Sequence, residues 1–397
     1  MRPDTAAVVG VGATPYYWRG QSAPQTMLEL TGKAVTAAVA DAGLTLDDVD
    51  GFAYYSGGFD TSLIAHTLGI PEIRFTATLT GGGGGSAGSV GLAAAAVISG
   101  QAEVVVSVMA IQQILKRFGA ALVPTKGVAG PYATAATPET DFLTPSGLFA
   151  PGQAFSMLAQ RHMYRYGTTR DHFAEVAIST RENAIRRPTS LKHDPLTLEE
   201  YHDARMISDP LCVFDYCLES DGAVAVVTTS LDRARDLRHP PAVVAGSAQG
   251  GWGRWGHAIR SMQMPDDYFA SSGHRPVAAR LYAQAGLGPE DVDVAELYDH
   301  FTPMVLMQLE DYGLCPVGEG GPFVADGNIR YEGGTLPVNT HGGNLSEAYI
   351  IGMTHVMEGV EQIRGTAVNQ VAGAEVALVT GGPAGLPVSS LLLRRDR

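Results

Sequence analysis

The sequence contains few cysteines, and their arrangement excludes the usual cysteine-built sites. Only three occur in 397 residues, at Cys212, Cys217 and Cys315, and none forms a CxxC pair. An odd number without regular spacing argues against a disulfide framework. The eleven histidines likewise form no HxH or HExxH pair, so we expect no bound metal. This pattern fits a reducing compartment, and we expect a cytoplasmic protein.

Long hydrophobic runs are also missing. No window reaches the roughly eighteen uninterrupted apolar residues that a membrane-spanning helix needs. The N-terminal sequence MRPDTAAVVGVGAT has no charged region followed by a long apolar one, as a secretory signal would. We therefore expect a protein that neither crosses a membrane nor is secreted.

Positive charge is scarce. The chain has 27 Lys and Arg residues against 41 Asp and Glu residues, a formal net charge of -14. Nucleic acids and anionic lipid surfaces are bound mainly through clustered Lys and Arg. Neither is an expected partner.

The remaining composition is that of a packed enzyme. Hydrophobic residues make up 45% of the chain and charged residues 17%, with 48 glycines, a profile unlike that of disordered chains. A chain of this length is expected to form two or three packed units.

An internal repeat indicates how these units arose. The sequence AVADAGLTLDDVDGFAYY from Ala38 is echoed by YAQAGLGPEDVDVAELYD from Tyr282, and both contain AGL, four residues and VD. Each copy predicts an amphipathic helix that ends at a glycine, Gly43 or Gly286, followed by a β-rich run. These glycines are 243 positions apart (286 minus 43), which indicates a duplicated α/β domain rather than a short-period solenoid.

The two predicted halves are separated by a segment without a repeat partner. Strands are expected at Ala6 to Ala13, at Pro241 to Gln249 and from Ser220. The unpaired segment begins with a Pro/Gly/Thr-rich stretch, Val123 to Pro151, and continues into a polar helix, RDHFAEVAISTRENAIRR. Long insertions of this kind are usually lids or binding loops. The predicted division is residues 1–115 and 220–240 for the first half, 116–219 for the insertion and 241–397 for the second half.

Three C-terminal motifs resemble the catalytic loops of thiolases. They are ELYDHFTP (Glu296 to Pro303), NTHGGNLSEAYIIGM (Asn339 to Met353) and AEVALVTGG (Ala374 to Gly382). Their order and spacing are most similar to the sterol-carrier-protein-X branch, whose loops read HDCF and NxxGGxxxxGHP. The resemblance implies an α/β thiolase fold, with two βα halves in a layered αβαβα arrangement and an inserted loop domain. It also implies a coenzyme A thioester as substrate and no further cofactor.

The chain departs from the thiolase pattern where the cysteine nucleophile belongs. That cysteine sits at the start of the first small-residue helix, where the helix N-terminus lowers the thiol pKa. Here the stretch reads LTGGGGGSAGSVG, and the nucleophile position falls near Gly84. The glycine run at Gly81 to Gly85 resembles a phosphate cradle but lacks a GK[ST] ending, so close backbone packing is the favoured interpretation.

Two tyrosines replace the histidines of the thiolase loops. Tyr349 stands at the histidine of the GHP loop and Tyr298 at that of HDCF, while His300 takes the place of the HDCF cysteine. These exchanges resemble the bacterial aldolases of steroid side chains, which carry the name of lipid-transfer proteins. The resemblance implies retro-aldol cleavage of a β-hydroxyacyl-CoA to a ketone and a shorter acyl-CoA. Such a step needs a base, an oxyanion hole and an acid but no covalent intermediate.

Site residues are assigned on this basis, with Tyr349 as the preferred base. The predicted catalytic residues are Tyr298, Tyr349, His300 and His341. The predicted backbone or oxyanion positions are Gly84, Gly382 and Asn339. Tyr298, His300 and His341 are also compatible with ordinary hydrogen-bonded core positions.

The densest basic stretch lies in the insertion. Its residues are Arg181, Arg186, Arg187 and Lys192. They predict either a solvated helix face or a site for the phosphates of coenzyme A, which the resembling thiolases hold with their loop domain.

Two functions other than an aldolase are compatible with the sequence. Ser86 lies near the missing cysteine and would support an acyltransferase if a base lay beside it; a silent acyl-CoA-binding subunit is the third possibility. Polar groups at all three loops favour an enzyme.

An exposed edge strand in thiolase-like halves predicts a homodimer, and the resembling aldolases imply a small OB-fold acyl-CoA-binding partner.

Overall fold

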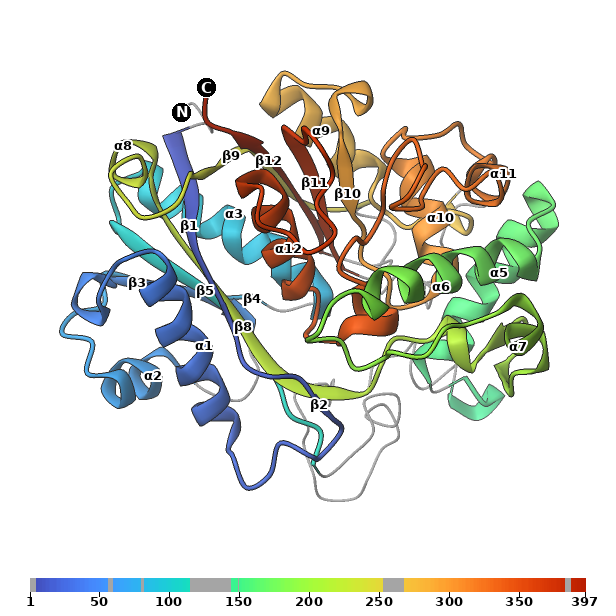
Figure 1. Cartoon of the computed structure of the whole chain (residues 1–397), viewed down its shortest axis with the longest axis horizontal. Coiled ribbons are helices and arrows are strands. Elements are labelled where there is room, and N and C mark those ends of the chain that lie inside the picture. Colours follow the sequence, from blue (N-terminus) through green and yellow to red (C-terminus); the bar gives the residue numbers. More distant parts are fainter. Residues whose placement is uncertain are drawn as a thin grey trace.

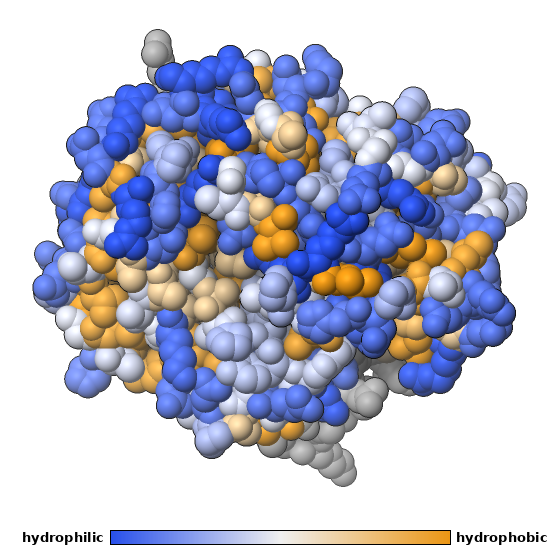
Figure 2. Space-filling model, viewed as in Figure 1, coloured by the Kyte–Doolittle hydropathy of each residue, from blue (hydrophilic) through white to orange (hydrophobic). Residues whose placement is uncertain are grey.

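The computed structural model shows a layered α/β protein (Figure 1). It describes residues 5–55, 60–79, 82–114, 144–148, 150–252, 268–382 and 387–397. The Pro/Gly/Thr-rich stretch predicted at Val123 to Pro151 lies largely outside these residues. Within them, no helix is long and apolar enough to cross a bilayer, and the face in Figure 2 mixes apolar side chains with a majority of polar ones.

One ten-stranded mixed sheet runs through both halves of the chain. From edge to edge its strands are β10 (Val294–Glu296), β11 (Val376–Gly381), β12 (Val388–Arg395), β9 (Ala242–Gly250), β1 (Ala6–Ala13), β8 (Ser220–Ser230), β5 (Val104–Ile111), β3 (Gly51–Tyr55) and β4 (Phe75–Leu79), with β2 (Tyr17–Trp18) paired to β8. The halves meet where β1 pairs with β9, Ala7 opposite Val243 and Val8 opposite Ala242. β5 is buried along its whole length, as expected for a strand covered on both faces.

The helices form three layers around the two halves of the sheet (Figure 1). Their bounds are α1 (Met27–Asp41), α2 (Thr61–Leu68), α3 (Gly85–Ile98), α8 (Leu231–Ala234), α9 (Arg275–Ala285), α10 (Thr302–Asp311), α11 (Gly320–Ala325) and α12 (Met353–Arg364). α1 and α2 share one apolar cluster with the outer face of the first half. α3 and α12 share another between the halves, and α9 and α10 cover the second half. The predicted αβαβα arrangement is confirmed.

The predicted insertion supplies a further group of elements. These are α5 (Pro151–Tyr166), α6 (Arg170–Ile185), α7 (Leu198–Asp203), β6 (Met206–Ser208) and β7 (Leu211–Cys212). Buried residues of α5 and α6 belong to the same apolar cluster as α10, so this segment packs on the second half. The exact division into domains stays a prediction.

The repeated helices end as the sequence predicts. α1 stops at Asp41 and the chain turns at Gly43, where φ is +75°. α9 stops at Ala285 and turns at Gly286, where φ is +65°. Glycine favours both positions because it adopts positive φ without a Cβ clash.

β1 and α1 approach closely enough to exclude a side chain. A Cβ at Gly12 would lie 2.3 Å from the backbone nitrogen of Ala38 and 2.6 Å from the carbonyl oxygen of Ala34. A Cβ at Gly32, within α1, would meet only a Leu68 methyl at 3.5 Å. Gly10 of the same strand is equally close to α1, since its Cβ would lie 2.2 Å from the Ala38 carbonyl oxygen. The close contact therefore depends on the glycines of β1 and not on Gly32.

Substituting these two glycines should move stability in opposite directions. Gly12→Ala should lower the free energy of unfolding by about 1–3 kcal/mol through overpacking. Gly32→Ala should leave it unchanged or raise it by up to about 1 kcal/mol, because alanine favours helix. Urea unfolding followed by circular dichroism measures both, and equal midpoints for the two variants would contradict the close packing.

Candidate active site

The three motif loops bring two tyrosine hydroxyls together. Tyr298 follows β10, and Tyr349 lies in the loop between residues 343 and 352. Their hydroxyl oxygens are 3.1 Å apart, and the residues are 1% and 3% exposed. The two hydroxyls therefore form a hydrogen bond away from bulk water, where such a contact is stronger than at the surface.

The backbone of Tyr298 is held from two sides. Its N–H donates to the Thr380 hydroxyl at 2.8 Å, and its carbonyl accepts from the Gln308 amide at 2.9 Å. Thr380 in turn donates to Gln308 at 2.6 Å. β11 and α10 thus fix the position of the ring.

Tyr349 is held by one serine. The Ser220 hydroxyl donates to the Tyr349 carbonyl at 3.0 Å, and the Tyr349 N–H donates to the Ser220 oxygen at 2.9 Å. The flanking backbone is unusual: residues Gly343–Glu347 form a short π-helix, and Ile351 has φ of +54°. Rare conformations of this kind persist where surrounding contacts enforce them, often at functional sites.

The turn before α3 has no room for a nucleophilic side chain. A Cβ at Gly83 would lie 2.2 Å from the Tyr298 ring carbon Cζ, and a Cβ at Gly84 would lie 2.0 Å from the Pro387 carbonyl oxygen. Gly382, with φ of +110°, approaches Gly84 so closely that its own Cβ would meet the Gly84 Cα at 3.0 Å. Gly84 and Gly382 are therefore adjacent, and the Tyr298 ring excludes a side chain at Gly83. A role for the two glycines as backbone positions of the site stays a prediction.

Ser86 lacks the surroundings of a nucleophile. Its hydroxyl is fully buried and donates to the Gly83 carbonyl at 2.8 Å. A serine nucleophile needs a base that accepts its proton. Here the Ser86 hydroxyl donates its proton to a backbone carbonyl instead. This contact counts against the acyltransferase alternative.

His300 lies beside Tyr298 in largely aromatic surroundings. Its ring lies 5.0 Å from the Tyr298 ring and edge-on to Phe155 at 4.5 Å. Its ring nitrogens make no hydrogen bond to a side chain of the described residues, and the Tyr298 backbone is the polar group that acts on the ring. Burial lowers the pKa of His300 to about 3, so the imidazole is neutral at physiological pH.

The contacts of His341 and Asn339 are with residues other than the two tyrosines. His341 Nδ1 is 2.8 Å from a Glu296 carboxylate oxygen, and its ring packs against His355, whose ring also lies 6.1 Å from that of Tyr298. Burial holds the pKa of His341 well below its usual value. The Asn339 amide donates to the Leu297 carbonyl and accepts from the Leu297 N–H. Both ends of the amide thus hold the strand end, and an oxyanion role for Asn339 stays a prediction.

Two of the four basic residues predicted for coenzyme A are internal. Arg187 lies within 2.6–3.0 Å of three carboxylates, those of Glu347, Glu358 and Glu361. It is 5% exposed. This saturated, buried guanidinium contradicts the predicted phosphate contact.

The other three basic side chains do not converge on one point. Arg181 is also buried and donates to the Ser346 hydroxyl and the Asp194 carbonyl, so its predicted contact is equally unsupported. Arg186 is exposed and pairs with Glu332 at 2.6 Å. Lys192 is half-buried over the Trp18 ring. Only Arg186 and Lys192 remain candidates for the coenzyme.

Sequence reasoning missed several polar residues that support the site. His355 Nε2 is 3.0 Å from Asp299, whose carboxylate also accepts from the Asn344 and Leu345 amides of the π-helix. Asp299 lies inside the YDHF motif, but nothing in the sequence marks His355 as its partner. Gln308, Thr380 and Ser220 were missed for the same reason.

The cysteines cannot replace the missing nucleophile. Burial raises the pKa of all three thiols, that of Cys315 to about 12, whereas reactive cysteines have lowered pKa values. No group of three or more acidic, histidine or cysteine side chains in the described part of the chain is arranged for a metal ion.

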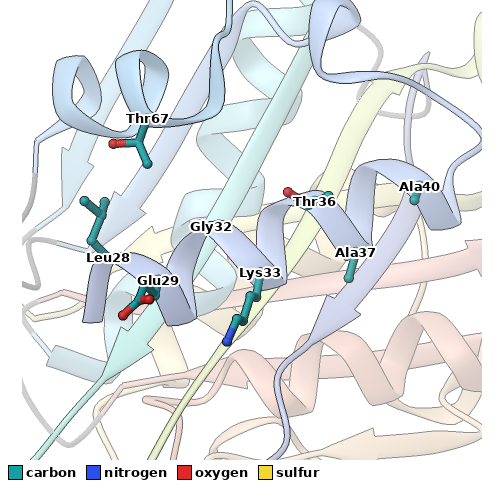
Figure 3. Close-up of a pocket in the computed structure, with 8 residues that line it drawn as sticks. All are labelled: Leu28, Glu29, Gly32, Lys33, Thr36, Ala37, Ala40 and Thr67. Atoms are coloured by element: carbon teal, nitrogen blue, oxygen red, sulfur yellow. The ribbon is translucent and has the colours of Figure 1, made fainter. Parts of the chain in front are cut away.

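An open hollow of 560 Å³ lies on the outer face of α1, around Gly32 and Ala37 (Figure 3), and contains none of the site residues. The two tyrosine hydroxyls can each donate and accept a proton.

Comparison with known proteins gives the family. The family described as "Thiolase C-terminal domain-like" matches residues 255–392. The "Steroid side-chain-cleaving aldolase" of Thermomonospora curvata is 41% identical, over 100% of this chain and 99% of the relative. The "17-hydroxy-3-oxo-4-pregnene-20-carboxyl-CoA lyase" of Mycobacterium tuberculosis is also 41% identical, over 99% of this chain and 100% of the relative.

Solved structures agree with this assignment. The structure described as "Ltp2-ChsH2(DUF35) aldolase" superimposes with a TM-score of 0.91 at 41% identity, covering 100% of this chain and 99% of the other. Human mitochondrial 3-ketoacyl-CoA thiolase superimposes with a TM-score of 0.71 at 15% identity, over 100% of both chains, which shows the shared fold. The chain therefore belongs to the thiolase superfamily, in the group that contains the steroid side-chain-cleaving aldolases.

Proposed function

We propose that this chain is an aldolase that cleaves a β-hydroxyacyl-CoA, with a steroid or similarly bulky side chain, into a ketone and a shorter acyl-CoA. The hydroxyl contact between Tyr298 and Tyr349, 3.1 Å long, carries this proposal. Both hydroxyls are capable of proton transfer, and they belong to the residues that stand at the histidine positions of the thiolase loops. The two full-length relatives, a side-chain-cleaving aldolase and a carboxyl-CoA lyase, support the same reaction.

The proposed reaction needs no covalent intermediate. Tyr349 accepts the proton of the β-hydroxyl, the C–O bond becomes a carbonyl, and the bond between the α and β carbons breaks. The electron pair of that bond forms the thioester enolate. A proton returned through Tyr298 then forms a new C–H bond at the α carbon. Substrate and products then balance without an oxidant, a reductant or water.

The glycine turn is the proposed site for the enolate oxygen. Gly84 and Gly382 lie against each other beside Tyr298, and backbone N–H groups at a helix start favour a negative oxygen. Arg186 and Lys192 are the proposed contacts for the phosphates of coenzyme A. A cytoplasmic location stays a prediction.

The predicted homodimer and partner protein have structural support. β4 is an edge strand that pairs only with β3 in the described sheet, and edges of this kind are usually covered. The relative's structure contains a DUF35 component by its description. We propose a homodimer through β4 and a second, small protein of the OB-fold type.

Size-exclusion chromatography with light scattering tests both associations. The chain alone should elute with twice its 41.7 kDa mass. Adding a DUF35-type protein from the same source should shift the peak to a larger mass and increase turnover. A monomer at micromolar concentration excludes the dimer, and full activity without any shift excludes a required partner.

Phenylalanine at either tyrosine should abolish most turnover. Tyr298→Phe and Tyr349→Phe keep the rings and delete the hydroxyls, and acid–base groups typically contribute ~10²- to 10⁴-fold. KM should change less than kcat, because the proton moves only in the transition state. The double variant should lose little more than the worse single variant, since both hydroxyls serve one relay.

Tyr331→Phe provides a matched control. The Tyr331 hydroxyl donates to the Gln370 carbonyl at 3.3 Å, a contact that involves neither Tyr298 nor Tyr349. Its removal should leave kcat within about threefold. The tyrosine mechanism is wrong if folded Tyr298→Phe and Tyr349→Phe behave like this control, since that change is far below the range of ~10²- to 10⁴-fold.

Removing all thiols should leave catalysis largely intact. A chain with serine at Cys212, Cys217 and Cys315 should retain most of its turnover if it folds, and iodoacetamide should not inactivate the parent enzyme. Turnover of a β-hydroxyacyl-CoA, with circular dichroism to check the fold, measures this. Loss of activity in a folded variant would indicate covalent catalysis.

A further inference from the structure

The carboxylate of Asp299 lies between the two loops that carry the tyrosines. Asp299 directly follows Tyr298 in the chain and is fully buried. One of its oxygens accepts a hydrogen bond from the Asn344 N–H at 2.8 Å, and the other accepts one from the Leu345 N–H at 3.3 Å. Both amides belong to the π-helix that precedes Tyr349. One side chain therefore joins the first tyrosine loop to the second.

A third contact connects the same carboxylate to α12. The Asp299 oxygen that accepts from Asn344 is also 3.0 Å from Nε2 of His355. His355 is fully buried in the first turn of α12, and its ring lies 6.1 Å from the Tyr298 ring. The carboxylate thus holds the segment around Tyr349 on both sides, at residues 344–345 before it and at residue 355 after it.

The two amides have no acceptor within the π-helix itself. The last two N–H groups of the π-helix donate to the Gly342 carbonyl, whereas those of Asn344 and Leu345 precede the first such bond and donate to Asp299. A buried N–H without an acceptor is costly. The carboxylate therefore stabilises the rare conformation that leads into Tyr349.

The length of the Asp299 side chain is fixed as well. A Cβ at Gly343 would overlap the Asp299 oxygen that accepts from Leu345, and φ of Gly343 is +60°. The π-helix approaches the carboxylate so closely only because its first residue is a glycine. A longer acidic side chain would push this backbone, and with it Tyr349, away from Tyr298.

We propose that Asp299 is a positioning residue that keeps the hydroxyls of Tyr298 and Tyr349 in contact. This inference rests on the aldolase function proposed above. The two oxygens are 3.1 Å apart, already long for a hydrogen bond between hydroxyls, so a small shift of either loop separates them. A misplacement of about 1 Å can cost ~10²-fold in rate. Asp299 acts on the reaction through the tyrosines and does not touch the substrate.

The other end of β10 offers a matched control. Asp293, the residue before β10, accepts hydrogen bonds from the N–H groups of Glu375 and Val376 at 2.8 and 2.9 Å. Asp293 and Asp299 therefore make the same kind of contact, a carboxylate on two consecutive amides, on either side of one strand. The partners of Asp293 lie at the start of β11 and not in a tyrosine loop.

Asparagine at each position keeps the size of the side chain but replaces one acceptor oxygen with an NH2 group. Asp299→Asn should lower kcat at least ~10-fold with KM within about threefold, because only the geometry of proton transfer is disturbed. Asp293→Asn should leave kcat within about threefold, far below the effect of a displaced acid–base group. Urea unfolding followed by circular dichroism checks that both variants fold. Equal changes of kcat in the two folded variants would overturn the proposal.

A double-variant cycle separates positioning from a general loss of structure. In a Tyr349→Phe background the hydroxyl contact is already gone, so Asp299→Asn should lower kcat by less than about threefold further. The same loss in both backgrounds would show a merely structural role and refute the proposal. His355→Leu, which leaves the two amide contacts in place, serves as a second variant if Asp299→Asn does not fold. It should lower kcat at least ~5-fold, again only while Tyr349 is present, and an unchanged kcat would count against positioning.

The hydroxyl contact can also be measured without turnover. Crystal structures should show the two tyrosine oxygens within hydrogen-bond distance in the parent and more than about 3.5 Å apart in Asp299→Asn. An unchanged distance in the variant would overturn the proposal. A pair of structures that differ as expected, from an enzyme that cleaves no β-hydroxyacyl-CoA, would refute the aldolase function instead.

Discussion

The contact between the Tyr298 ring and the glycine turn before α3 is the constraint on which the rest of the site depends. A side chain at Gly83 would collide with this ring, and one at Gly84, the predicted nucleophile position, would collide with the Pro387 carbonyl oxygen. The turn therefore leaves no room for a thiol at either position. Once the ring is there, its hydroxyl meets Tyr349 and the site is limited to acid–base chemistry.

Buried hydrogen bonds to the backbone, rather than ion pairs, hold the two tyrosines in position. Gln308 and Thr380 hold the backbone of Tyr298, and Ser220 holds that of Tyr349. Burial keeps His300 neutral. In such a low-dielectric environment a developing oxyanion interacts strongly with oriented dipoles. A permanent charge beside the tyrosines would instead require costly desolvation.

A cluster of charged side chains connects the insertion to the loop that carries Tyr349. Arg187, just after α6, joins Glu347 of the π-helix to Glu358 and Glu361 of α12. Burial raises the pKa of Glu347 to about 7. Removing the arginine would leave the buried carboxylates of Glu347 and Glu358 and the partly exposed one of Glu361 without their cation. Deleting one partner of a buried ion pair costs several kcal/mol, on the order of 3–5. The basic stretch of the insertion is thus tied to the position of Tyr349.

The sequence by itself determined the duplicated fold, its main strands, the helix ends at Gly43 and Gly286, and the loss of the nucleophile. These features are local: hydrophobic periodicity, a glycine after a helix and a motif in fixed order can be read within a few residues of one another. It also identified Tyr298 and Tyr349, because both lie inside recognisable motifs. Tertiary structure alone decided that Arg187 is buried, that Asn339 holds a strand end and that Asp299 meets His355. Those outcomes depend on partners far along the chain, such as Glu358 for Arg187 and Leu297 for Asn339, and no local pattern records which distant polar groups meet when the layers pack.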